Sequence, residues 1–547
     1  MYLTDNPVLQ RELLVNLRMT RAFALLFVYQ ALLGVVVYFA WPRDVERLDL
    51  TTNPIEARLL ADLFFLGQYV LASLMAPSFA AEAITGEKER KTYEMLLASP
   101  LRPAAIVLGK LVASLAHLAV LIFASLPIIM LCLPLGGVSL YEVLAAYLGL
   151  ILSVLTFGMI SIACSSYFKR TAASLVVSYL LILPLAISAV LLWYSLRDLG
   201  GNVRLSLTVT VMPVAALVVC GLLFRNTSNR LLHPPDVGSE GMDVVDLDQE
   251  AQQAVGLVIQ RDQFPDSLFA PPKRDTLMDD RANPVYDKEV RSEIFSQGTL
   301  MLRLVIQVSM VLAIPFMAVC LYILPKYSAW YIAYVVTFNL LVGPVFSAGS
   351  VTSERERETL DLLLTTTITP WQILWGKLLA GLRVSSVLTM FLVWPVALAC
   401  IMVAVYWTNL GAVAAYLGIV LTSCLTTATI ALFCSVLFHK TSVSLMTTYV
   451  IIVLLFFAPV AIIYFAEAFF EGHPATPWVK TIGIVSPFST AFNVPTIMEI
   501  TGVGDQPAVP TGDWRLVGLY EAFTLGLDAT LFGLMLWLFN YRWRVTG

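Results

Sequence analysis

The chain has 547 residues, of which 58% are hydrophobic and 13% are charged, and its formal net charge is −4. Soluble domains carry roughly 25% charged residues, so this composition excludes an ordinary water-soluble domain and indicates a protein that lies mostly in a bilayer. The small net charge indicates no particular partner, and we expect no nucleic-acid ligand.

The N-terminal segment, residues 1–20, is polar and lacks the apolar core of a cleavable signal peptide. Asn6 followed by Pro7 is typical of a helix start, because proline at the first helical position loses no needed donor. The next residues separate into an apolar side and a charged side that includes Arg11 and Glu12, which predicts an interfacial helix on the inner leaflet. A similar segment starts later in the chain, with Asn283, Pro284, Lys288 and Glu289.

Twelve apolar runs are long enough to cross a bilayer, which takes about 20 residues. The first six lie at 22–41, 60–81, 106–133, 140–167, 174–194 and 206–224, and the second six at 300–324, 330–351, 373–405, 410–438, 442–466 and 516–540. The chain is therefore predicted to be an all-α polytopic membrane protein of about 12 transmembrane helices. Because six is even, the two halves enter the membrane in the same direction, as parallel six-helix repeats.

The two halves also repeat each other in sequence. A constant offset of 267 aligns residues 87–115 with 354–382 without a gap, and 13 of these 29 positions are identical. Leucine enrichment alone would not align charges, a proline and a Gly-Lys pair in one register. The chain is therefore an internal duplication, with a first six-span unit at 1–225, an acidic linker at 226–282 and a second six-span unit at 283–547. The linker is either a plain solvated segment or a regulatory one.

Orientation follows from Lys and Arg close to the span ends. In both halves these residues gather on one side, at Lys88, Arg102, Lys169, Arg355 and Lys440, which predicts that both termini and both duplicated segments are cytoplasmic.

Each duplicated segment combines charged residues with an apolar stripe. Tyr93, Leu96 and Leu97 stand at i, i+3 and i+4, which predicts a short amphipathic helix, and the second copy has the same spacing. Lys110 and Lys377, just inside the next span, are expected to snorkel to the headgroups. A cytoplasmic loop needed only for topology is the alternative, but the mixed charge favours a protein partner.

The order of these features resembles the permeases of type-2 ATP-binding-cassette (ABC) transporters. The shared features are an amphipathic N-terminal helix, two spans, the pattern E-x-E-R-x-T-x-[ED]-x-L-L, a proline, and Gly-Lys at the opening of the third span. The resemblance covers nearly the whole chain, twice, and implies two permease units around a central path. It also implies a coupling helix between spans two and three, which docks on a nucleotide-binding subunit.

Carried onto this sequence, the resemblance assigns ATPase coupling to one set of residues in each half. They are Glu87, Glu89, Arg90, Thr92, Glu94, Leu96 and Leu97, and then Glu354, Glu356, Arg357, Thr359, Asp361, Leu363 and Leu364. It assigns docking support to the interfacial helices that carry Arg11, Glu12, Lys288 and Glu289. Type-2 permeases often have polar or re-entrant helices between spans five and six. The external loop 467–513 has room for them, although a plain solvated loop is the alternative.

The ATPase itself is not expected in this chain. A phosphate-binding loop needs GxxxxGK[ST], and neither Gly109-Lys110 nor Gly376-Lys377 has the upstream glycine or the following hydroxyl. We therefore expect a permease that is not an enzyme and binds no cofactor, with ATP and Mg²⁺ held by separate cytoplasmic ABC ATPase subunits. The expected role is export across a prokaryotic cytoplasmic membrane, the cell inner membrane. One chain would supply both halves of the path, with pairing of two copies as the alternative.

Two other classes of protein remain open, a secondary transporter driven by an ion gradient and a membrane scaffold without transport activity. Asp528, near the middle of the last span, is the one intramembrane acid that stands out. An acid there costs roughly 2.5–3.5 kcal/mol on insertion scales, so it should face the bundle or water. It either lines a translocation path or makes a structural hydrogen bond. The sequence offers no convergent cluster for a metal or for nucleophilic catalysis.

Overall fold

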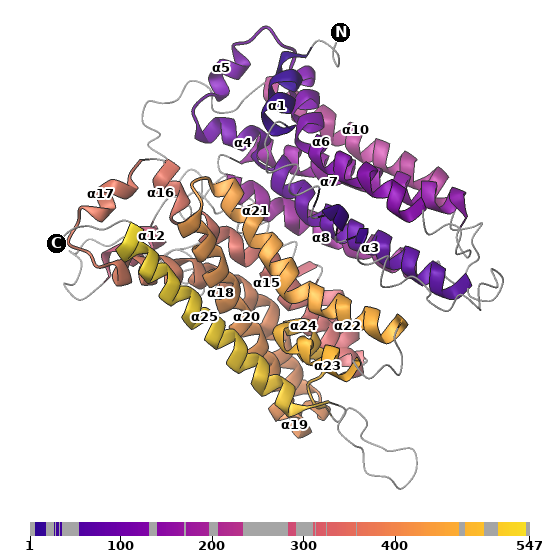
Figure 1. Ribbon diagram of the computed structural model, residues 1–547, viewed down its shortest axis with the longest axis vertical. Helices are drawn as coiled ribbons and strands as arrows, with labels where there is room; N and C mark the ends of the chain where they lie inside the picture. The colour runs from indigo at the N-terminus through magenta and orange to yellow at the C-terminus, as the bar shows by residue number, and fades with distance from the viewer. Residues whose placement is uncertain are drawn as a thin grey trace. The chain divides into compact units, whose positions relative to one another are not determined.

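The computed structural model confirms an all-α fold. It describes residues 6–17, 27, 29–31, 33–34, 54–130, 139–168, 171–195, 206–232, 283–291, 310–311, 313–323, 325–356, 358–469, 476–496 and 512–542, and these residues contain helices and no strand. The chain comprises two compact units, Met1–Val244 and Val245–Gly547. Figure 1 shows the helices of each unit, and each unit is described by itself below.

The first unit is built around one central helix. Its elements are α1 (Pro7–Leu17), α3 (Pro54–Ala80), α4 (Glu82–Glu89), α5 (Tyr93–Leu97), α6 (Pro103–Met130), α7 (Leu140–Tyr167), α8 (Thr171–Ser195), the π-helix η4 (Leu207–Val211) and α10 (Met212–Leu232). Helix α7 packs against α3, α6, α8 and α10. A capping box starts it, in which Ser139 and Glu142 each satisfy the other's backbone N–H.

The second unit repeats this arrangement around α20. Its elements are α12 (Pro284–Arg291), η6 (Ala318–Ile323), η7 (Pro325–Tyr327), α15 (Ser328–Ala348), α16 (Thr352–Glu356), α17 (Leu360–Leu364), α18 (Pro370–Met402), α19 (Val405–Thr408), α20 (Leu410–Leu437), α21 (Thr441–Ile452), η8 (Val453–Phe457), α22 (Ala458–Phe469), α23 (Thr476–Thr481), η9 (Ile482–Val485), α24 (Pro487–Phe492) and α25 (Trp514–Arg542). Helix α20 packs against α15, α18, α21 and α25.

The described residues include nine helices that are long and apolar enough to cross a membrane. They span Leu60–Glu89, Pro103–Met130, Leu140–Tyr167, Thr208–Leu231, Ser328–Glu356, Pro370–Met402, Leu410–Leu437, Val443–Glu467 and Trp514–Tyr541. The 25-residue helix α8 covers a tenth predicted span, 174–194. Most of the predicted span 22–41 and about half of the predicted span 300–324 lie outside the described residues. A polytopic membrane protein is thus confirmed, and twelve spans stays a prediction.

Two regions differ in detail from the sequence-based outline. Helix α10 runs to Leu232, so the first residues of the predicted linker, 226–232, are helical. The reason is local, because Arg230 stacks over the ring of Tyr167 at 3.9 Å and so holds the helix end against α7. The rest of the linker, 233–282, lies outside the described residues.

In the predicted external loop 467–513, the part around α24 is packed and is not a plain solvated loop, whereas Trp478 of α23 is 77% exposed. Pro487, Phe488 and Ala491 are buried, and helix α24 packs against α15, α20 and α25. The Ser486 hydroxyl donates a hydrogen bond of 2.6 Å to the carbonyl of Phe456 in the π-helix η8. This bond satisfies a carbonyl where the regular helical ladder is interrupted, and so fixes the loop to the bundle.

Candidate functional site

In each unit a sharp elbow joins two short helices between the second and third spans. At the elbow, Lys91 has φ 58° and Glu358 has φ 57°, both in the left-handed region. The N–H of Thr92 donates to the carbonyl of Glu87, and that of Thr359 donates to the carbonyl of Glu354. This is a Schellman ending of α4 and α16, a geometry for which glycine is usual. The duplicated segment is therefore two helices with a strained corner, and only the second of them, α5 or α17, matches the predicted amphipathic helix.

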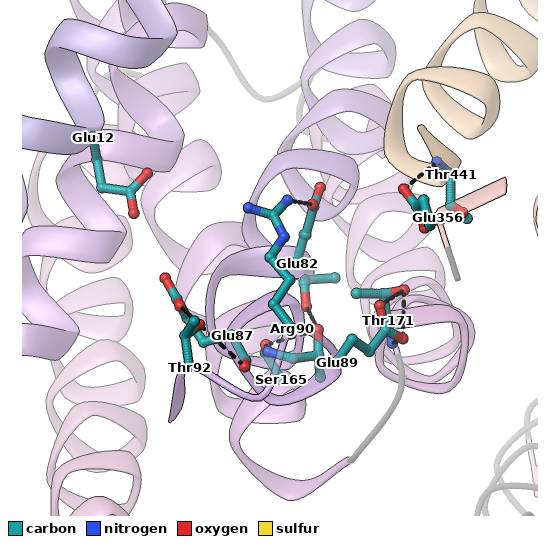
Figure 2. Close-up of polar contacts among 12 residues, drawn as sticks. Glu12, Glu82, Glu87, Glu89, Arg90, Thr92, Ser165, Thr171, Glu356 and Thr441 are labelled. Carbon is teal, nitrogen blue, oxygen red and sulfur yellow. Dashed lines mark hydrogen bonds and ion pairs between the residues drawn. The ribbon is translucent and has the colours of Figure 1, made fainter. Parts of the chain in front are cut away.

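The first acid of each duplicated segment folds back onto its own elbow. The Thr92 hydroxyl donates to the Glu87 carboxylate, and the Thr359 hydroxyl donates to that of Glu354. Figure 2 shows Glu87 and Thr92 pointing toward one another. These acids therefore close the corner of their own unit, and their contact with a partner stays a prediction.

The same acids also bind a buried lysine at the start of the third span. Lys110 is 4% exposed, and its Nζ lies 3.2 Å from Glu87 and 3.6 Å from Glu12. In the second unit the Lys377 side chain is 0% exposed, and its Nζ lies 2.6 Å from Glu289 and 3.8 Å from Glu354. We call each such set, one lysine with two glutamates, a lysine clamp. It joins the interfacial helix, the elbow and the third span through one ammonium group.

The expectation that these lysines snorkel to the headgroups is wrong. The Lys377 side chain instead turns inward. Its ammonium group contacts two carboxylates and donates a hydrogen bond of 2.7 Å to the carbonyl of Ser350. A buried ammonium is tolerated only where charge and hydrogen bonds compensate its lost hydration, and the clamp provides both.

An asparagine ties the interfacial helix to the third span beside each clamp. Asn6 Oδ1 accepts from the N–H of Val8, and its Nδ2 donates to the carbonyl of Ala105 at 2.8 Å. Asn283 makes the same pair of bonds in the second unit. A Cβ at Gly109 would lie 2.9 Å from Asn6 Nδ2, so the glycine of each Gly-Lys pair permits this close approach. Asn-Pro and Gly-Lys, two separate sequence signals, form one joint.

The remaining charged residues before the elbow hold neighbouring helix ends. Glu89 accepts from the N–H of Thr171 at 2.9 Å, and Glu356 accepts from that of Thr441 at 3.0 Å, so each acid caps the next helix. Lys88 donates to the carbonyl of Ser166 at the end of α7. Glu89 and Glu356 thus hold helix ends within their own units, and their contact with an ATPase stays a prediction.

The outward surface of each segment lies just beyond the elbow. Met95 is 76% exposed and Leu362 is 68% exposed, and the two occupy equivalent positions. Next to them Glu94 and Asp361 are also exposed. We call each pair a tip, Glu94 with Met95 in the first unit and Asp361 with Leu362 in the second.

The predicted leucines anchor these helices to the protein. Leu363 and Leu364 pack against an apolar cluster that includes residues of α12, α18, α20 and α25, and Leu96 and Leu97 are half-buried. The i, i+3, i+4 pattern thus marks the packing face. The residues between its members had to point outward, which is the signal that would have identified Met95.

The other predicted residues lie near these joints or outside the described part. Arg11 is exposed on α1, and Arg90 pairs with Glu82 at 3.4 Å. Lys288 lies 2.7 Å from Glu354. Arg357 is not among the described residues. No group of three His, Cys, Asp or Glu side chains in the described ranges could hold a metal ion.

The fold and the paired elbow joints define the chain as a polytopic membrane protein made of two related helical units. The family model described as ABC-2 family transporter protein matches residues 11–203 and 240–539. The chain therefore belongs to this family and is a membrane permease of an ABC transporter. Two matched regions fit two permease units fused in one chain. No curated protein matches it.

Removing the clamp lysine should destabilise the second unit strongly. We expect Lys377→Met to lower the free energy of unfolding by about 3 kcal/mol, because it removes the buried ammonium group on which the largely buried carboxylates of Glu289 and Glu354 converge. The measurement is thermal or denaturant unfolding of the purified chain. Lys288 is the matched control, because it binds the same Glu354 but is 57% exposed, and Lys288→Met should cost about 0.5 kcal/mol. Equal losses would contradict the clamp.

Glycine at either elbow should stabilise the protein. The left-handed conformation costs a residue with a side chain roughly 1–2 kcal/mol. Glycine removes this cost, but it loses more backbone entropy on folding, which cancels part of the gain. We expect Lys91→Gly and Glu358→Gly each to gain about 0.5 kcal/mol in unfolding experiments. Lys91→Ala, which removes the charge and keeps the strained corner, should give no gain, and a gain as large as that of glycine would refute the strain.

Proposed function

We propose that this chain is the permease of an ATP-driven exporter, and that separate ABC ATPase subunits bind at the two tips. The proposal rests on two features of each tip. Its apolar residue is exposed, and the elbow and the lysine clamp join it to the third span. Met95 and Leu362 present that apolar residue. Large exposed apolar side chains beside charged ones are typical of protein contact sites.

The elbow and the clamp form a path for force from tip to membrane. The elbow fixes α5 to α4, and the ion pair between Glu87 and Lys110 joins the elbow to α6. Helix α6 packs against α3, α7 and α10. In the second unit α17 also packs on an apolar cluster that includes residues of α18 and α25. A partner that displaces either tip would move a spanning helix with it.

The proposed orientation places the tips and both chain termini in the cytoplasm. Its support is the placement of basic residues such as Lys88, Lys91 and Arg102 near the span ends at the tip side. ATP and Mg²⁺ would then be held by the partner subunits in the cytoplasm, and export is the direction that the resemblance to type-2 permeases implies. A prokaryotic cytoplasmic membrane is the proposed location.

The surfaces beside the two tips differ in charge. The left-handed corner carries Lys91 in the first unit and Glu358 in the second, and both side chains are exposed. Glu82, which pairs with Arg90, is replaced by Gly349 in the second unit. We propose that one chain supplies both halves of the path and that its two ATPase contacts differ in strength.

An acid at the tip residue should release the ATPase. We expect Met95→Asp and Leu362→Asp each to weaken copurification of co-expressed ABC ATPase subunits about tenfold, a loss of about 1.4 kcal/mol, because each buries an unpaired charge in the contact. The measurement is the amount of ATPase retained by the purified chain and the rate of ATP hydrolysis of the complex.

Met95→Leu is the matched control, since leucine stands at the equivalent position of the second unit, and it should retain the ATPase. The isolated chain should keep its melting temperature in all variants, because both side chains are largely exposed. Full retention of the ATPase by the double variant with both acids would remove the proposed docking role.

A further inference from the structure

One buried acid in the second unit has no part in the clamps or the tips. Asp528 stands at the centre of α25, 14 residues after Trp514 and 14 before Arg542. At 1.5 Å per residue, about 21 Å of helix separates it from either end. It is 6% exposed. The second unit therefore holds a carboxyl group close to the middle of its last span.

Both oxygens of this carboxyl group face hydroxyl groups of α20. Thr429 Oγ1 lies 2.5 Å from Oδ1, and Thr426 Oγ1 lies 3.1 Å from Oδ2. Within the described residues no ion pair joins Asp528 to Lys, Arg or His. Its immediate partners are thus two neutral groups from one neighbouring helix.

The hydroxyl groups around Asp528 can accommodate a protonated carboxyl group. Each threonine hydroxyl also lies near a backbone carbonyl of α20, Thr426 Oγ1 at 2.8 Å from Thr422 O and Thr429 Oγ1 at 2.9 Å from Thr426 O. Two hydroxyl protons therefore face four acceptors if the acid is ionised. If the carboxyl group is protonated, its O–H is a third donor. It then donates to one threonine hydroxyl, and that hydroxyl donates to a backbone carbonyl of α20.

Ionisation would also place a negative charge in the membrane that no cation among the described residues balances. An uncompensated charge at the centre of a spanning helix is unfavourable. We propose that Asp528 is a proton-binding site, loaded in this conformation, that latches α25 to α20. Its proton leaves when the two helices part and water reaches the carboxyl group, which links a helix movement to protonation.

The described charged and titratable groups on α25 and on the helices packed against it do not provide a positive charge at Asp528. On α25 itself the nearest such groups are Tyr520 and Glu521, eight and seven residues before Asp528, and Arg515, Tyr541 and Arg542 stand near the helix ends. Helix α20 contributes Cys424 nearby, whose Sγ donates to Thr389. On α18, Lys377 is held in its clamp and Arg383 donates to Tyr286. The packed segments η9 and α24 contain no titratable residue.

The latch belongs to the second unit alone. The last predicted span of the first unit, 206–224, contains no charged residue. Protonation would therefore act on one half of the chain, which distinguishes the two units within the membrane.

Infrared spectroscopy of the full chain in lipid nanodiscs tests the proposal. We expect a carbonyl stretch of a protonated carboxyl group at neutral pH in the wild type and its loss in Asp528→Asn. In Thr426→Val/Thr429→Val the band should persist and shift to higher frequency, because the carboxyl group loses its hydrogen bonds. Identical wild-type and Asp528→Asn spectra in this region would overturn the proposal, and so would a wild-type band that the threonine substitutions leave unmoved.

The pH dependence of stability is an independent measurement. The folded chain holds a proton that the unfolded, water-exposed chain releases, so the wild-type melting temperature should fall as pH rises. Asp528→Asn, a neutral isostere, should lack that component and match the wild type at low pH. Parallel profiles for the two proteins would contradict a loaded proton site.

Discussion

The buried ammonium group of each lysine clamp is the interaction on which the organisation of both units depends. Lys110 and Lys377 stand at the start of the third span, and each holds a glutamate from the interfacial helix and one from the elbow. An ammonium removed from water needs such compensation, so none of the three segments can shift without exposing an unpaired charge. Three short elements that would be marginal alone thus behave as one body.

The clamp explains why the repeated segments keep the residues they share. Glycine before the lysine permits the asparagine of the interfacial helix to approach the third span, and threonine after the elbow satisfies the first glutamate. Glu89 and Glu356 cap the following helices. Most residues of the motif that resembles a coupling sequence therefore stabilise the elbow and the clamp from within. The proposed contact residues are Met95 and Leu362, which differ between the two copies.

Hydropathy, the constant offset and the helix-start signals predicted the all-α membrane fold and the duplication, because backbone satisfaction in a bilayer leaves few alternatives. The direction of the lysine side chains was not predictable. A long flexible chain can reach headgroups or turn inward, and only the neighbouring Glu12 and Glu289, distant in sequence, decide between them. The outward position of Met95 was implied by the leucine spacing. The hydroxyl partners of Asp528 come from α20, about 100 residues earlier, which no local pattern shows.

Site-specific photo-crosslinking from Met95 and Leu362 reports whether the two tips contact the ATPase. A photoreactive amino acid at either position should give a covalent product with a co-expressed ABC ATPase subunit in membranes. The same amino acid at Phe123, which is 57% exposed on the spanning helix α6, should give none. We expect products from both tips, and their absence from both tips in a complex that still copurifies would show that the ATPase docks elsewhere.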